Sequence, residues 1–404
     1  MSLDIPALND TPLDQLKEQA QRLGLQQPPR RRSDLAFAVA QALATQRNLL
    51  LGRGVLEVHG EGFGFLRSPS DNFLPGHDDI YVSQSQIRRF RLQTGDTVIG
   101  QVRPPKEGER YTALLRVESI NGDPPGSEPQ GFEHLTAIYP DERIAIHQDA
   151  LLHPIDRIAP LGLGQRGLFV APSRTGRVEI LRHLVDTMAS DDDLEVTVLL
   201  IGERPEEIEE WRANSEAEVI ATPFDDPALR HMQVADIVFE RARRQVEHGD
   251  DVVLVIDSLT RLLRACMSEL PATGREFSGV DVSALFRLRR YLGAARALEE
   301  GGSLTVIGVV SGEPEGRLTR ALLEDLDEVV NWTCVLSREV ANRGIRPPID
   351  VHRSATLRSE RLITNDERTA LEQFRATLTG DSVEDATNLL AWVHGLPTTS
   401  AASR

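Results

Sequence analysis

The chain has 404 residues, of which 40% are hydrophobic and 26% charged, and its formal net charge is −17 at pH 7. This length predicts two or three domains with ample core, and no apolar run reaches the ~18 residues of a membrane span, which excludes a membrane-spanning helix. The first residues are not expected to form a signal peptide, and Cys266 and Cys334 lie in apolar contexts typical of inert buried thiols. We therefore expect a cytoplasmic protein.

The charge is unevenly distributed. Residues 1–120 carry 15 basic and 14 acidic side chains, so the negative charge belongs to the rest of the chain. Acidic chains usually avoid nucleic acid, but a near-neutral first third with clustered arginines leaves nucleic-acid binding open. Only two lysines occur, Lys17 and Lys106, so arginine supplies nearly all the positive charge.

Residues 1–48 predict a small helical domain. Helical patterns run to about Arg22 and from Ser33 to about Thr45, with the basic turn Pro28–Arg32 between them. Basic turns of this kind more often stay solvated than bind a ligand, and contact with nucleic acid is the alternative.

From Gly54 the hydrophobic period changes to two. Five short segments of alternating character with glycine-rich turns predict an OB-type, cold-shock-like β-barrel over residues 50–118. The expected strands are Val55–Val58, Gly62–Leu66, Asp79–Val82, Thr97–Val102 and Tyr111–Val117.

A linker is expected over residues 119–150, and an α/β domain with a C-terminal helical tail over residues 151–404. Near-continuous apolar strands separated by helices indicate a parallel sheet covered on both faces. The strands are expected at Leu168–Val170, Glu195–Ile201, Val252–Ile256, Leu304–Val310 and Val329–Leu336. The helices are expected at residues 177–189, 204–214, 227–247, 283–299 and 318–326, with tail helices at Glu367–Leu378 and Ser382–His394.

A strand–turn–helix pattern spans Gly167–Val178 and is typical of a phosphate-binding loop, in which backbone N–H groups and a helix N-terminus hold phosphates. The match to G-x-x-x-x-G-K-[ST] is incomplete. Ala171 takes the first glycine position, Arg177 the lysine position, and Val178 the position of the hydroxyl that holds Mg²⁺. Taken alone, such a segment is more often an ordinary turn between a strand and a helix.

Aromatic and basic side chains gather on one face of the expected barrel. Phe63, Phe65 and Arg67 alternate along one strand, and Tyr81 and Tyr111 can join the same face. Rings that stack on bases and a guanidinium for phosphate are what a platform for single-stranded nucleic acid needs. The alternative is a barrel core built from aromatic residues, and Arg67 at the same parity argues against a buried face.

The rim of this face carries further polar groups. Glu109 or Asp79 could accept a hydrogen bond from an exocyclic amine such as cytosine N4. Positive charge along the rim is expected from Arg88, Arg89, Lys106 and Arg110.

Two carboxylates follow apolar strands of the expected sheet. Asp257 ends such a strand, as does the Walker-B aspartate that orients the Mg²⁺ shell, although many parallel strands end in aspartate. Glu203 emerges from another strand and could polarise an attacking water. The alternative for Glu203 is an acid stabilised near a helix N-terminus.

Long ordered runs of the chain resemble the family of the bacterial transcription termination factor Rho, over roughly residues 10–365. The runs are Gly62–Arg67, Asp78–Ser83, Arg88–Phe90, Thr94–Asp96, Arg103–Tyr111, Glu203–Glu207, Val255–Arg261, Gly293–Arg296 and Glu299–Thr305. The resemblance implies a small helical domain, an OB-type RNA-binding domain and a RecA-like P-loop ATPase domain. It also implies a hexameric ring that binds C-rich nascent RNA, has RNA polymerase as a partner, and couples ATP hydrolysis to translocation and transcript release.

The resemblance assigns roles residue by residue. The RNA site would comprise Phe63, Phe65, Arg67, Asp79, Tyr81, Glu109, Arg110 and Tyr111, with Arg88, Arg89 and Lys106 on the rim. Glu203 matches the family's catalytic glutamate, and Asp257 matches the aspartate that holds Mg²⁺ indirectly. The nucleotide site would comprise Arg174, Thr175, Gly176, Arg177, Val178 and Arg346, the last aligned with a phenylalanine that faces adenine.

The departures from the family cluster where ATP would react. The family's loop carries lysine, glycine, lysine and threonine where this chain has Arg174, Gly176, Arg177 and Val178. The arginine-finger position aligns with Leu357, one residue before Arg358. The resemblance thus implies ATP and Mg²⁺, but these residues predict weak or absent hydrolysis. The chain is expected to be either a Rho-like terminating ATPase or a hydrolysis-deficient RNA-binding subunit, in a homo-hexamer or in a mixed ring with an intact Rho.

Overall fold

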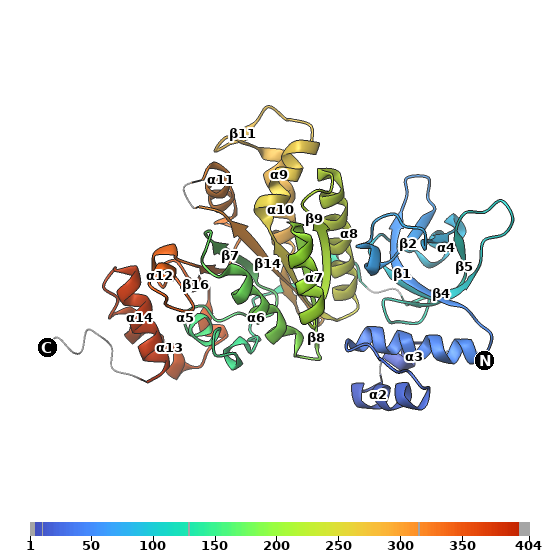
Figure 1. Cartoon of the computed structure of the whole chain (residues 1–404), viewed down its shortest axis with the longest axis horizontal. Helices are drawn as coiled ribbons and strands as arrows, with labels where there is room; N and C mark the ends of the chain where they lie inside the picture. The colour runs from blue at the N-terminus through green and yellow to red at the C-terminus, as the bar shows by residue number, and fades with distance from the viewer. Residues whose placement is uncertain (1–4, 10, 128–129, 314–315, 396–404) are drawn as a thin grey trace. The chain divides into compact units, whose positions relative to one another are not determined.

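The computed structural model describes residues 5–9, 11–127, 130–313 and 316–395 (Figure 1). By their contacts the residues group into two compact units, Met1–Leu135 with Gln233–Asp250, and Thr136–Met232 with Asp251–Arg404. Among the described residues, no helix has both the length and the apolar character needed to cross a bilayer.

The first unit begins with three helices, α1 (Ile5–Asn9), α2 (Leu13–Arg22) and α3 (Arg32–Gln46). Leu16 and Ala20 lie four residues apart on α2, so they share a face. That face packs in one apolar cluster with Leu35 and Val39, which share a face of α3 in the same way. The two helices expected here are confirmed, and α1 is additional.

Five strands close into a barrel in the order β1–β2–β3–β5–β4, which confirms the expected OB-type domain. Leu56, Leu66, Val82 and Val98 fill its interior. Every neighbouring pair is antiparallel except β3 with β5. The strands are β1 (Leu51–Val58), β2 (Gly64–Arg67), β3 (Ile80–Val82), β4 (Thr97–Arg103) and β5 (Thr112–Ile120), with α4 (Gln84–Phe90) between β3 and β4.

Gly64 has no room for a side chain, because an added Cβ would lie 2.7 Å from the Glu57 carbonyl oxygen. We expect Gly64→Ala to lower the free energy of unfolding by about 1–3 kcal/mol, the usual cost of overpacking. Urea denaturation measures the change. Gly60→Ala is the matched control, since nothing lies within 4 Å of a Cβ added there. Equal stability of the two variants would contradict this packing of β1 on β2.

The second unit is built on a sheet with the strand order β16–β15–β7–β14–β10–β8–β9. The six strands from β15 to β9 in this order run parallel, and β16 (Ala355–Thr356) is antiparallel at the edge beside β15. The parallel strands are β7 (Arg166–Ala171), β8 (Leu194–Glu203), β9 (Glu218–Pro223), β10 (Asp251–Asp257), β14 (Ser303–Ser311) and β15 (Trp332–Val335).

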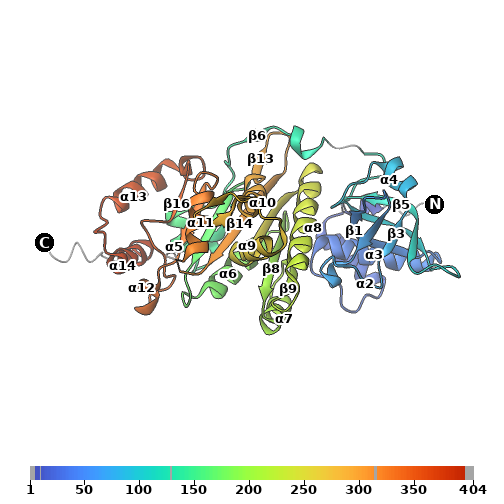
Figure 2. The ribbon, with the colours of Figure 1, turned by 90° about the horizontal axis from the view of Figure 1, so that it is seen from above.

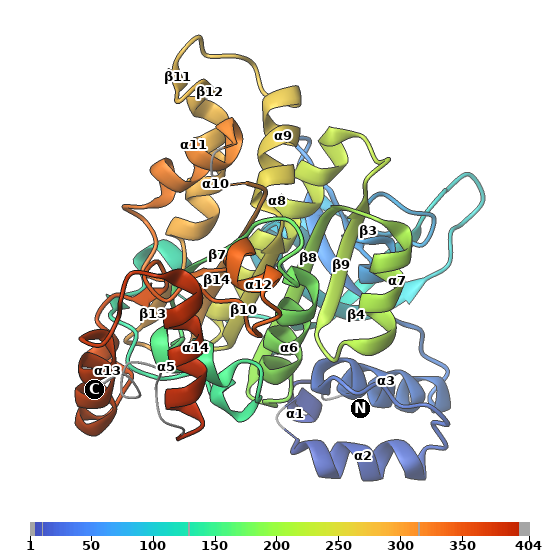
Figure 3. The same ribbon diagram turned by 60° about the vertical axis from the view of Figure 1, so that its left-hand side comes forward.

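Helices cover both faces of this sheet, as its apolar strands predict. Successive strand residues point to opposite faces. Val309 of β14 belongs to the apolar cluster that includes Leu181 of α6 (Arg177–Ala189), which lies against the sheet in Figure 3. A Cβ added at the neighbouring Gly308 would instead meet Leu259 of α9 (Leu259–Glu269) and Leu292 of α10 (Val282–Gly293).

Some expected elements differ from those observed. The helix expected over residues 283–299 is wrong at its end, because α10 stops at Gly293 and β13 (Arg296–Leu298) follows. β13 pairs with β14 and with β6 (Ala137–Ile138), and Figure 2 shows β13 and β6 together. Neither β9 nor α9 was expected. The remaining elements are α5 (His153–Ile158), α7 (Pro205–Asn214), α8 (Ala228–Glu247), β11 (Glu276–Phe277), β12 (Val280–Asp281), α11 (Arg317–Leu326), α12 (Arg338–Asn342), α13 (Asn365–Arg375) and α14 (Ser382–Val393).

Candidate functional site

Five rings form a continuous aromatic cluster on the outer face of the barrel: His59, Phe63, Phe65, Tyr81 and Tyr111. The ring centroids lie 4.8 Å apart for Phe65 and Tyr111, 5.3 Å for His59 and Phe63, and 5.9 Å for Phe63 and Tyr81. The antiparallel register places Phe65 of β2 opposite Tyr81 of β3. The cluster is partly exposed, with 37% of Tyr81 open to solvent, so its rings are available for stacking on bases.

Arg67 lies two residues after Phe65 on β2 and so shares its face of the strand, but it is not open to solvent. It is 3% exposed and forms an ion pair with Asp79, which is equally buried. Its Nε donates to Glu57 Oε2 at 2.8 Å, and its guanidinium carbon lies 5.0 Å from the centre of the Phe65 ring. The expectation that Arg67 marks an open position is therefore wrong. The Arg67–Asp79 pair is instead buried, and its guanidinium packs against Phe65 of the aromatic cluster.

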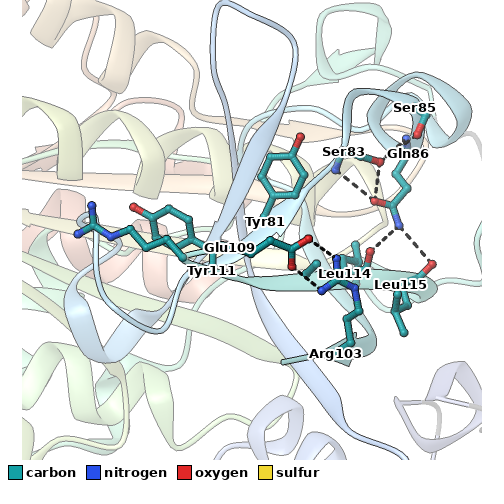
Figure 4. Close-up of a pocket in the computed structure, with 11 residues that line it drawn as sticks. Tyr81, Ser83, Ser85, Gln86, Arg103, Glu109, Tyr111, Leu114 and Leu115 are labelled. Atoms are coloured by element: carbon teal, nitrogen blue, oxygen red, sulfur yellow. Dashed lines mark hydrogen bonds and ion pairs between the residues drawn. The ribbon is translucent and has the colours of Figure 1, made fainter. Parts of the chain in front are cut away.

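A cavity of about 570 Å³ lies beside the aromatic cluster, and Figure 4 shows the rings of Tyr81 and Tyr111 and the Arg103–Glu109 pair around it. Glu109 accepts hydrogen bonds from Arg103 Nη2 at 2.9 Å and from the Lys106 N–H at 3.0 Å. The bond from Arg103, helped by the Lys106 N–H, lowers the pKa of Glu109 to about 2. The carboxylate is thus charged at neutral pH and keeps lone pairs for a further donor.

Gln86 forms part of the wall of this cavity, and hydrogen bonds hold its side chain in place. The Gln86 amide donates to the carbonyl oxygens of Leu114 at 3.1 Å and Leu115 at 3.4 Å, and accepts from the Ser83 N–H at 3.2 Å. This side chain shapes the cavity, because its polar atoms are engaged within the protein. The rim residues are exposed, as expected: Arg88, Arg89, Lys106 and Arg110.

The loop between β7 and α6 has the backbone of an anion-binding turn. Arg174 and Gly176 adopt left-handed conformations, with φ of 62° and 78°, and Gly176 is the N-cap of α6. Such turns direct successive N–H groups to one side. The buried Thr175 hydroxyl donates to the Pro172 carbonyl at 2.8 Å and fixes the turn, while the Arg174 side chain is exposed.

Arg177 turns toward two carboxylates at the ends of neighbouring strands. It forms an ion pair with Asp257 of β10, and its Nη2 lies 3.6 Å from Glu203 Oε2 of β8. Glu203 also accepts from Arg261 Nη1 at 2.6 Å. Two buried carboxylates and two partly exposed guanidinium groups thus balance in what we call the charge cluster: Arg177, Glu203, Asp257 and Arg261.

The pKa values of the two carboxylates are shifted in opposite directions. Burial raises the pKa of Asp257, which is 2% exposed, and the charges of Arg177 and Arg261 oppose this rise. Burial also opposes ionisation of Glu203, but the hydrogen bond and charge of Arg261 outweigh it and lower the pKa of this carboxyl.

The other expected nucleotide-site residues lie apart from the charge cluster. Val178 lies in the first turn of α6 and has no side-chain oxygen. Arg346 forms an ion pair with Glu179. Arg358 lies with its guanidinium carbon 4.3 Å from the centre of the Tyr139 ring, and the neighbouring Leu357 is 65% exposed.

Sequence reasoning missed His59 and Arg261. His59 follows β1, and its N–H donates to the Phe63 carbonyl at 2.8 Å, so the short turn between β1 and β2 brings the two rings together. Arg261 follows Asp257 by four residues. The change from a strand pattern to a helix pattern after Asp257 is the signal that could have placed Arg261 at this end of the sheet. In the described part of the chain, no group of three or more His, Cys, Asp or Glu side chains converges as a metal site.

Two family models match the chain: "Rho termination factor, RNA-binding domain" over residues 52–126, and "ATP synthase alpha/beta family, nucleotide-binding domain" over residues 152–356. Two solved structures share the fold of part of the chain. A prototypical type III secretion ATPase gives a TM-score of 0.53 at 22% identity, covering 64% of this chain and 80% of that chain. The type III secretion ATPase EscN of enteropathogenic Escherichia coli gives 0.52 at 20% identity, covering 74% and 75%.

Curated relatives match nearly the whole chain. Transcription termination factor Rho of Pseudomonas aeruginosa is 42% identical over 376 residues, and that of Haemophilus influenzae is 43% identical over 377 residues. Each match covers 90% of this chain and 90% of the relative. The same coverage and 42% identity hold for Escherichia coli Rho. With its OB-type barrel and RecA-like sheet, the chain belongs to the family of transcription termination factor Rho.

Proposed function

We propose that this chain is an RNA-binding termination factor of the Rho type, which takes C-rich single-stranded RNA on its barrel and hydrolyses ATP slowly or not at all. The observation that carries the RNA-binding function is the cavity beside Tyr81 and Tyr111, with the charged Glu109 in its wall. The N4 amine of cytosine donates a hydrogen bond to a carboxylate, whereas uracil has a carbonyl oxygen at that position. Glu109 therefore favours cytosine.

We expect Phe65→Ala and Tyr81→Ala each to weaken oligo(C) binding by about 1–3 kcal/mol, the usual worth of a stacked base. Glu109→Gln should reduce the preference for oligo(C) over oligo(U), because an amide can serve either base. Fluorescence anisotropy with labelled oligonucleotides measures both effects, and affinity should fall steeply with salt. The control is Phe224→Ala, an aromatic of the second unit that is 63% exposed. Equal wild-type affinity for the two oligonucleotides would contradict the role of Glu109.

We also propose assembly into a homo-hexameric ring. The departures from the family lie at ligand-contacting positions, while the strands and helices of the RecA-like sheet are complete. Light scattering should show oligomers that RNA stabilises. A single species of 44.7 kDa at micromolar protein, with and without RNA, would contradict the ring.

A second candidate function is that of a hydrolysis-deficient subunit that joins an intact Rho in a mixed ring and modulates termination by RNA polymerase in the cytoplasm. The ion pair between Arg177 and Asp257 favours it, because that pair occupies a carboxylate that ATP chemistry uses. Adding this chain to an intact Rho should then lower the poly(C)-stimulated hydrolysis of that ring. Unchanged hydrolysis would exclude this second candidate.

A further inference from the structure

The charge cluster lies at the end of β10, where nucleotide-binding loops of this kind place a metal ion. We propose that the guanidinium of Arg177 takes the place of the divalent cation at the carboxyl end of β10, so that the phosphate loop binds a nucleoside triphosphate without metal. This inference rests on the proposed nucleotide-binding role of the loop and is independent of the RNA site on the barrel.

The residues at this position do not fit Mg²⁺. The ion requires a nearly octahedral shell of oxygen atoms. In a phosphate-binding loop it takes one of them from the Ser or Thr hydroxyl that follows the basic residue. Val178 stands there instead. Arg177 already engages Oδ2 of the Asp257 carboxylate, so a cation occupies one of its two oxygens before any metal could bind.

The charges lead to the same conclusion. Asp257 and Glu203 are the two carboxylates that would attract a divalent cation, and both are nine-tenths or more buried. Arg177 and Arg261 already neutralise them. A divalent cation added to this balanced cluster would gain little net attraction, because the two guanidinium groups offset the two carboxylates.

A guanidinium can serve both sides of the site. It carries five N–H donors in a planar fork, so donors remain for phosphate while others contact carboxylates. Arg177 is the first residue of α6, whose N-terminal N–H groups favour anions. Arg338 also stabilises the loop between β7 and α6, because its Nη2 donates to the Ser173 carbonyl at 3.0 Å. Arg177 thus separates the phosphates from Asp257, as a cation would.

The direct test is ATP binding by calorimetry, once in EDTA and once in millimolar Mg²⁺. We expect the wild-type dissociation constant to differ by less than about threefold between the two conditions. Arg177→Lys with Val178→Thr restores the ordinary loop chemistry, so this variant should bind ATP about tenfold or more tightly with Mg²⁺ than without. Wild-type binding that tightens tenfold or more with Mg²⁺ would overturn the proposal, and so would the absence of ATP binding in both conditions.

A second measurement needs no nucleotide. If Arg177 is the partner of Asp257 in the resting protein, Asp257→Asn should lower the melting temperature of the ligand-free chain. Asp251→Asn, at the opposite end of β10, is the matched control and should leave it unchanged. Equal melting temperatures of the two variants would also overturn the proposal. Oligo(C) binding measured on the same samples reads the barrel alone, so failure of this inference and failure of the RNA-binding function are distinguishable.

Discussion

ATP hydrolysis in the presence of poly(C) RNA is expected to be absent, or at least about 10³-fold slower than that of an intact ring ATPase. Arg177 replaces a compact ammonium with a planar fork that turns to Asp257. Val178 offers no oxygen to a metal ion. Leu357 presents a hydrocarbon side chain, 65% exposed, at the position where we expect the arginine finger, a group worth about 10³–10⁵ in rate.

Because these parts act together, single repairs should not restore turnover. Arg177→Lys with Val178→Thr should raise nucleotide affinity first, and adding Leu357→Arg should then raise the hydrolysis rate in the assembled ring. The same series with Leu357→Met is the control for packing at that position. A phosphate-release assay with and without poly(C) measures each variant.

The expectation of slow ATP hydrolysis depends most on whether Arg358 can act as the arginine finger. Arg358 comes one residue after the position where we expect the arginine finger. Its guanidinium packs on the Tyr139 ring. Robust poly(C)-stimulated hydrolysis by the unmodified protein, lost in Arg358→Ala, would show that Arg358 acts as the finger from a shifted register.

The second large effect is expected at the Arg67–Asp79 ion pair of the barrel. Arg67→Met should lower the free energy of unfolding by about 3–5 kcal/mol, the cost of leaving a buried charge without its partner. The side chains of Arg67 and Asp79 are 4% and 3% exposed, so water cannot replace the lost guanidinium. Denaturant unfolding followed by circular dichroism measures the change.

Two further variants separate the charge from the packing. Arg67→Met combined with Asp79→Leu removes both charges and should recover most of the loss, because a buried pair is often no more stabilising than apolar residues of similar size. Arg88→Met removes an exposed arginine of α4 and should change little. A loss below about 1 kcal/mol in Arg67→Met would contradict the buried ion pair.

The fold could be predicted largely from hydrophobic periodicity. A period of two from Gly54 gave the five barrel strands, and continuous apolar runs such as Val252–Ile256 gave parallel strands, because both faces of that sheet are buried. The strand β13 could not be found in this way. β13 has only three residues, and its pairing with β14 and β6 depends on segments far apart in the sequence.

The site was predictable as a set of residues but not as a set of interactions. Alternation over residues 63–67 placed Phe63, Phe65 and Arg67 on one face, yet alternation does not reveal that the Arg67 guanidinium is buried with Asp79. The incomplete loop motif identified Arg177 and Val178 as unusual. Only the fold brings β8 and β10 side by side, so that Glu203 and Asp257 meet Arg177.

We propose above all that the barrel binds C-rich single-stranded RNA through its aromatic cluster. The most direct measurement is the affinity of wild type and of the Phe65→Ala, Tyr81→Ala double variant for oligo(C) at one fixed salt concentration. We expect the double variant to lose about 2–6 kcal/mol in binding free energy, the worth of two stacked bases. Equal affinity of the two proteins for oligo(C) would contradict it.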